Sequence, residues 1–69
     1  MTKLNIILNG NNFLIEKNCN LTKLVAILEL DIKKIAIEKD LEIINPQDFN
    51  NVFLEEGSRI EIVHFIGGG

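Results

Sequence analysis

The chain ends in three consecutive glycines, Gly67 to Gly69, and this terminus offers the clearest opportunity for chemistry. Glycine has no Cβ atom, so another protein's backbone can approach it closely, and three extended residues reach about 10 Å. A terminal carboxylate is a poor electrophile, but joining it to AMP creates a mixed anhydride with a good leaving group. A sulfur nucleophile can then attack and leave a thiocarboxylate on Gly69. Frayed ends and expression scars also contain glycine, so the tail alone does not decide.

Cys19 and His64 are each the only residue of their type and are the other candidates for reactivity. Cys19 precedes an expected helix whose dipole could stabilise a thiolate, but a buried packing cysteine is the commoner case, and we expect a spectator. No motif holds a nucleophile or carboxylate beside His64, which we expect to be half-buried and hydrogen-bonded. We predict no catalytic residue and no metal site, because these two residues do not supply zinc ligands at the required spacing.

Composition predicts one small soluble domain. The 69 residues are 46% hydrophobic and 6% aromatic, so the core should be aliphatic. One cysteine excludes an internal disulfide, and no segment approaches the roughly 18 apolar residues of a membrane span. The start of the chain does not have the pattern of a signal peptide. We therefore expect no membrane association and a reducing compartment, the cytoplasm or the plastid stroma.

The net charge of −3 comes from ten acidic and seven basic residues. Nucleic-acid binding favours a basic patch, so we expect no nucleic-acid partner. A mildly acidic surface would suit an electropositive protein partner, although its commoner role is to keep a protein soluble. The pair Glu55-Glu56, and Asp40 with Glu42, fall in expected turns and are interpreted as solvated surface.

Hydrophobic periodicity predicts the order β-β-α-β-β-β, with one helix packed on one face of a mixed sheet in an α+β fold. The helix should start at an Asn20 or Thr22 cap and fade near Asp31, burying one stripe. Phe49 and Phe53 should pin a loop or single helical turn after Pro46 to the core. The expected strands and the helical stripe are residues 4–8, 13–16, 34–38, 41–44 and 59–65, and Leu21, Leu24, Val25 and Leu28.

Three stretches carry a family resemblance: Ile35-Ala36-Ile37 leading to Ile44-Asn45-Pro46, the run from Leu54 to Val63, and Gly67-Gly68-Gly69. With them, the whole chain resembles the thiamine-biosynthesis sulfur carrier family, which has the ubiquitin-like β-grasp fold. The chain departs from the family pattern at Glu38, Gln47 and Ser58. The resemblance implies a single sulfur-carrier domain over residues 1–69, with a flexible tail at 66–69.

The same resemblance implies a protein co-substrate and not an enzyme. An E1-like adenylating enzyme would consume ATP to activate the carboxylate of Gly69, and a persulfide-bearing sulfurtransferase would supply sulfur. Thiazole synthase would then take that sulfur into the thiazole ring of thiamine. The chain itself would bind no cofactor. It would contribute Gly69 as the acceptor, preceded by Gly67 and Gly68, which have no side chains.

Strand alternation places Val63 and Phe65 on the face of the last strand that Glu61 shares, which should avoid the core. Ala36, between core-facing neighbours, is expected to join them in an apolar docking patch at the root of the tail. The alternative is that Phe65 folds over the sheet edge and simply packs. Two other functions remain open: the small subunit of molybdopterin synthase, and a β-grasp interaction module without tail chemistry.

Overall fold

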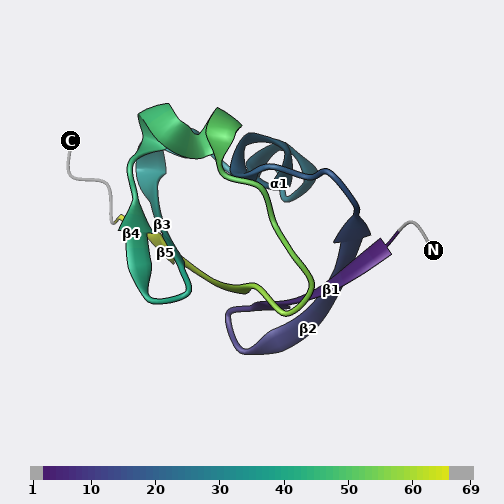
Figure 1. Cartoon of the computed structure of the whole chain (residues 1–69). Helices are drawn as coiled ribbons and strands as arrows, with labels where there is room; N and C mark the ends of the chain where they lie inside the picture. The colour runs from purple at the N-terminus through teal and green to yellow at the C-terminus, as the bar shows by residue number, and fades with distance from the viewer. Residues whose placement is uncertain (1–2, 66–69) are drawn as a thin grey trace.

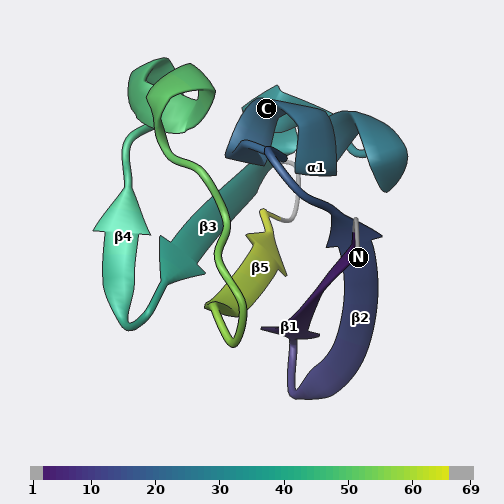
Figure 2. The same ribbon diagram turned by 45° about the vertical axis from the view of Figure 1, so that its right-hand side comes forward.

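The computed structural model describes residues 3–65, and residues 1–2 and 66–69 lie outside the described part. Within residues 3–65, five strands form one mixed sheet in the order β2-β1-β5-β3-β4 (Figure 2). Helix α1 and the 3-10 helix η2 lie on the same side of this sheet (Figure 1). The elements are β1 (Lys3–Leu8), β2 (Asn11–Glu16), α1 (Leu21–Ile27), η1 (Ile32–Lys34), β3 (Ile35–Lys39), β4 (Glu42–Ile44), η2 (Pro46–Asn51) and β5 (Arg59–His64).

The predicted β-β-α-β-β-β order is confirmed, and two short 3-10 helices are added to it. The core is aliphatic, as the composition predicts, and it lies between α1 and the sheet. Each large apolar side chain removed from water there contributes about 1.5–3 kcal/mol before the entropy cost of ordering is counted. Its fully buried large members are Phe49, Ile6, Leu21, Leu24, Ile37, Ile60 and Cys19.

Strand β5 occupies the centre of the sheet and pairs in opposite senses on its two sides. It runs parallel to β1, with Ile7 opposite Arg59, and antiparallel to β3, with Ala36 opposite Val63. Backbone bonds from Ile7 N to the Ser58 carbonyl and from Gly57 N to the Asn5 carbonyl, both 2.8 Å, extend the contact with β1. The last strand is therefore held along both edges.

Turn residues at the two hairpins also bind β5 through their side chains. Asn9, at φ 48°, accepts from the Ile62 N–H at 2.7 Å and donates to the Ile62 carbonyl at 3.4 Å, so its amide imitates one more residue of β1. On the other side Asp40, at φ 51°, accepts from the Arg59 N–H at 3.0 Å. Asn and Asp tolerate this left-handed conformation better than most residues, which explains their place in both turns.

Helix α1 ends earlier than the apolar stripe predicts. Asn20 is the N-cap, since its side chain accepts from the Lys23 N–H at 2.8 Å, but the helix stops at Ile27 rather than near Asp31. Glu29 adopts φ 57°, and the Leu30 N–H donates to the Val25 carbonyl at 3.0 Å. This is a Schellman-type ending, which closes a helix while returning an apolar residue to the core. No helix in the described part of the chain is long and apolar enough to cross a membrane.

The two phenylalanines predicted to pin the region after Pro46 behave differently. Phe49 is 1% exposed and lies in η2, as predicted, whereas Phe53 is 50% exposed, so that expectation was wrong. Phe53 lies in extended backbone between half-buried Val52 and buried Leu54. Successive side chains of extended backbone point to opposite sides, so burying its neighbours turns Phe53 outward.

Ser58 is buried and closes the turn that leads into β5. Its hydroxyl accepts from the Glu55 N–H at 2.8 Å, and its own N–H donates to the Glu55 carbonyl at 2.9 Å. The departure from the family pattern at this position therefore supplies the acceptor that the turn needs. Glu56 is exposed, but its carboxylate accepts from the Asn5 N–H at 3.0 Å.

Replacing Asn9 tests how much the side-chain bonds to β5 contribute to stability. Asn9→Ala leaves the Ile62 N–H without its acceptor and places alanine, which tolerates left-handed backbone less well than asparagine, at φ 48°, so we expect a loss of about 2–4 kcal/mol in unfolding free energy. Asn9→Gly removes the same bonds without the backbone strain and should lose less. Urea denaturation would measure both, and a loss below about 0.5 kcal/mol for Asn9→Ala would contradict the role.

Asp40 should make the stability depend on pH in acid. The hydrogen bond from the Arg59 N–H, aided by Lys39, lowers the pKa of the Asp40 carboxyl below its ordinary value. A depressed folded pKa stabilises the fold above the unfolded pKa, and this contribution disappears as the pH falls through the folded value. Asp40→Asn keeps the acceptor but not the charge, so thermal melts should show a shallower decline below about pH 4 than wild type. Identical declines would show that the charge contributes nothing.

Candidate functional site

The predicted acceptor site, Gly67, Gly68 and Gly69, lies outside the described residues, and the structure shows only where it is attached. Strand β5 ends at His64, and the Phe65 N–H still donates to the Lys34 carbonyl at 2.8 Å. The chain is thus paired with β3 up to His64 and bonded to the end of η1 at Phe65, the residue before the predicted tail at 66–69. A group activated at Gly69 would be separated from an ordered body by few residues.

The three residues predicted to form a docking patch lie together on the sheet face opposite α1, called here the outer face. Ala36 is directly opposite Val63 in the register between β3 and β5. Val63 is 58% exposed and Phe65 is 56% exposed, while Ile60 and Ile62 on the other face are buried. The predicted division of β5 into two faces is confirmed, and Phe65 is not buried by folding over the sheet edge.

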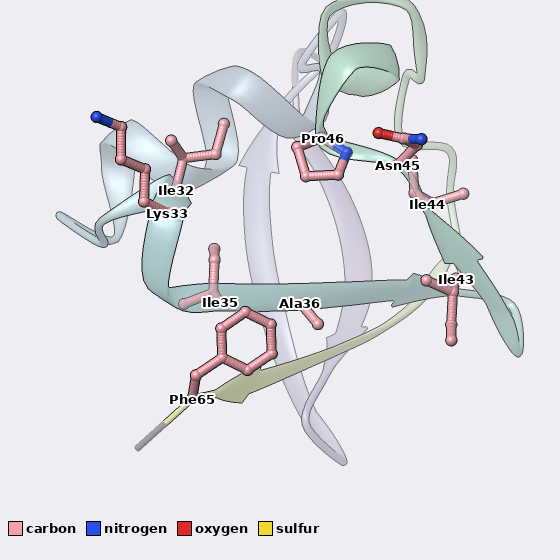
Figure 3. Close-up of a pocket in the computed structure, with 9 residues that line it drawn as sticks. All are labelled: Ile32, Lys33, Ile35, Ala36, Ile43, Ile44, Asn45, Pro46 and Phe65. Carbon is pink, nitrogen blue, oxygen red and sulfur yellow. The ribbon is translucent and has the colours of Figure 1, made fainter. Parts of the chain in front are cut away.

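A groove with a volume of about 700 Å³ lies beside this patch (Figure 3). Strand β4 pairs only with residues 37–39 of β3, so the first two residues of β3 have no neighbour on that side. Figure 3 shows Phe65 beside Ile35 and Ala36, facing across to Ile43, while the charged end of Lys33 points away. Its lining residues are Ile32, Lys33, Ile35, Ala36, Ile43, Ile44, Asn45, Pro46 and Phe65.

Sequence reasoning found Ala36 and Phe65 of this groove but missed its other walls. Ile43 is 73% exposed, although the sequence suggested only a short apolar strand around it. The signal was present, because alternation in a strand that buries Ile44 turns Ile43 to the other face. The contribution of Ile32 had no such signal, since it depends on how η1 sits against β3.

The outer face also carries two carboxylates at its centre. Glu38 and Glu61 are directly opposite each other in the antiparallel pairing of β3 with β5, and both are half-buried. Ile43 pairs with Glu38 from the other side, so an exposed apolar side chain lies beside the acidic pair. The departure from the family pattern at Glu38 therefore falls within this surface, whereas Gln47 is exposed in η2.

Cys19 is buried in the core, whereas His64 is exposed at the end of β5. Cys19 is fully buried, and burial raises the pKa of its thiol above the ordinary value, with Lys23 opposing the shift. A raised pKa keeps the thiol protonated near neutral pH, which makes it a poor nucleophile. His64, the last residue of β5, is exposed rather than half-buried as predicted. Within residues 3–65 no three His, Cys, Asp or Glu side chains form a possible metal site.

Comparison with known proteins places almost the whole chain in one family. The model of the ThiS family matches residues 4–69. The sulfur carrier protein ThiS of Bacillus subtilis is 36% identical over 63 residues, which cover 90% of this chain and 96% of that protein. A thiazole synthase of Paramagnetospirillum magneticum is 33% identical over 64 residues, or 93% of this chain. The match covers 20% of that synthase, so the chain spans only about a fifth of its length.

Solved structures agree on the fold. The crystal structure of a ThiS protein from Geobacter metallireducens superposes with a TM-score of 0.84 at 23% identity, covering 96% of this chain and all of that one. A designed protein based on human ubiquitin superposes with a TM-score of 0.55 over the whole chain, at 17% identity. The expected ubiquitin-like β-grasp fold is therefore confirmed. Together with the family model and the Bacillus subtilis relative, these matches show that the chain belongs to the ThiS family.

Proposed function

We propose that this chain is a sulfur carrier protein of thiamine biosynthesis and that it receives sulfur at the carboxylate of Gly69. The single observation that carries the proposal is the match to the ThiS family model, which runs from residue 4 to Gly69 and so includes the terminal glycines. The sulfur carrier of Bacillus subtilis, which matches along nearly its whole length, supports the same role.

The proposed chemistry uses the tail as an acyl group that partner enzymes modify. An adenylating enzyme joins the carboxylate of Gly69 to AMP from ATP and releases pyrophosphate. A persulfide on a sulfurtransferase displaces AMP, and cleavage of the sulfur–sulfur bond by a thiol leaves the thiocarboxylate. Gly67 and Gly68 let the tail enter a narrow channel, because neither has a side chain to exclude.

In this proposal the folded body is the part of the chain that partner enzymes bind, and it does not catalyse the reaction. The chain is one sulfur-carrier domain, residues 1–69, whose folded body the partners bind and whose tail, residues 66–69, they modify. The chain binds no cofactor and no metal, and ATP is consumed by the adenylating partner. Thiazole synthase is the proposed consumer of the sulfur, supported by the relatives of that name that contain a similar segment. We place the carrier in the cytoplasm.

The patch of Ala36, Val63 and Phe65, together with the adjoining groove, is the proposed docking surface. Its apolar residues are exposed and lie where the tail is attached, so an enzyme that reaches Gly69 must cover them or pass close by. Burying such side chains against a partner removes apolar surface from water and favours association. Of the alternative functions, the molybdopterin synthase subunit and the interaction module without tail chemistry have no relative among these matches to favour them.

Modification of the tail can be followed by intact-mass spectrometry. After incubation with ATP, a persulfide donor and the adenylating enzyme, the protein should gain the mass difference between one sulfur and one oxygen atom, located at Gly69. Deleting Gly69, or adding a C-terminal tag, should abolish the gain because the acceptor carboxylate is lost or displaced.

Cys19→Ala is the matched control for this experiment, because it removes the thiol and leaves the tail intact. It should gain the same mass as wild type, since Cys19 is buried and its thiol is not the proposed acceptor. A wild-type protein that stays in the carboxylate state with active enzymes would contradict the proposal, as would a gain that Cys19→Ala abolishes.

Val63→Asp tests the docking surface. A carboxylate in the centre of the apolar patch must be desolvated on binding, so affinity for the adenylating enzyme should fall at least tenfold while circular dichroism stays unchanged. Leu14→Asp is the matched control, because Leu14 is a 63% exposed apolar residue of the edge strand β2, far from the tail in the sheet order. Isothermal titration calorimetry would compare the two, and equal losses would argue against a local docking patch.

A further inference from the structure

The acidic pair at the centre of the outer face works against the stability of the isolated domain. Glu38 and Glu61 are directly opposite on neighbouring antiparallel strands, where side chains approach most closely. Like charges in this position repel, and partial burial weakens the screening that water would provide. Such a cost at the middle of a surface needs a reason, because a glutamine at either position would avoid it.

Within residues 3–65, neither Glu38 nor Glu61 takes part in a salt bridge. Its two salt bridges join Lys3 to Glu16 at 3.0 Å and Lys39 to Asp40 at 3.1 Å. Arg59 is on the same face of β5, two residues before Glu61, but it forms no salt bridge with either glutamate. No salt bridge within residues 3–65 neutralises the pair, so its negative potential can attract a cation of a partner.

Apolar residues lie next to the acidic pair on the same face, which also carries Arg59 two residues before Glu61 on β5. Val63 is the next outward-facing residue of β5 after Glu61, and Ile43 is directly opposite Glu38 on β4. Both are more than half exposed. The attraction between a carboxylate and a partner's cation becomes stronger when apolar side chains beside them help exclude water, because the effective dielectric constant falls. The surface therefore fits a protein that presents a cationic side chain among apolar ones.

We infer that the outer face of β3, β4 and β5 binds thiazole synthase through an arginine or lysine of the synthase, which is received between Glu38 and Glu61. This inference rests on the proposed function, and it adds the charge chemistry by which one partner recognises the carrier. One cation placed near two carboxylates removes their mutual repulsion and gains attraction from both. The synthase is chosen because two proteins of that name include a segment similar to almost all of this chain.

Charge-neutralising variants separate recognition from folding, because the two effects have opposite signs. Glu38→Gln and Glu61→Gln each remove the repulsion, so the melting temperature should stay the same or rise. The dissociation constant for purified thiazole synthase of the source organism should nevertheless increase about tenfold at low salt. Glu38→Lys should melt still higher, since it faces Glu61 with opposite charge, and should bind more weakly again because it repels the partner's cation.

Glu29→Gln is the matched control. It makes the same change in net charge at an exposed residue that follows α1, away from the outer face. It should leave binding within about twofold of wild type, and raising the salt concentration should weaken wild-type binding more than that of Glu38→Gln. Equal effects of Glu29→Gln and Glu38→Gln would overturn the inference, as would unchanged affinity in both outer-face variants or no binding of wild type to the synthase.

Mass spectrometry of the tail keeps this result distinct from the proposed function. If wild type acquires sulfur at Gly69 but the outer-face variants bind the synthase as wild type does, the inference fails and the function stands. If the variants lose binding in the expected order while wild type never acquires sulfur, the recognition stands and the carrier role fails.

Discussion

The central position of β5 is the constraint on which the rest of this molecule depends. It pairs with β1 on one side and with β3 on the other, and its inward residues Ile60 and Ile62 are buried beneath α1. Because both edges are occupied, β5 cannot shift in register without moving its buried residues to the wrong face. That restriction determines which side chains reach the outer face and where the tail begins.

The fold was largely predictable because its strands alternate cleanly and its helix has one apolar stripe. The division of β5 into two faces followed from the position of Glu61, and the placement of Ala36 opposite Val63 agrees with it. What could not be predicted depends on contacts across the chain. The early end of α1 rests on a left-handed Glu29, and the bonds of Asn9 to Ile62 join residues that no local pattern connects. The like-charge pair became visible only with the register between β3 and β5.

The buried core and the proposed docking surface lie on opposite faces of one sheet. The inner face carries the aliphatic core, and substitutions there would alter the fold itself. The outer face carries exposed apolar residues and an unfavourable pair of carboxylates, which add little to the stability of the domain. In the proposed role several enzymes would bind one small body, and this separation would let them do so without disturbing the core.

The parallel pairing of β1 with β5 also bears on how the protein is made. Ile7 and Arg59 are neighbours in the sheet but lie near opposite ends of the described sequence. During translation β1 can therefore pair only with β2 until nearly every other element has left the ribosome, because its second partner, β5, is made last among the strands. Contacts so distant along the chain slow folding, and the nascent sheet remains open meanwhile. The five-stranded sheet can therefore close only after β5 has emerged, so synthesis of this central strand sets the earliest moment at which the body is complete.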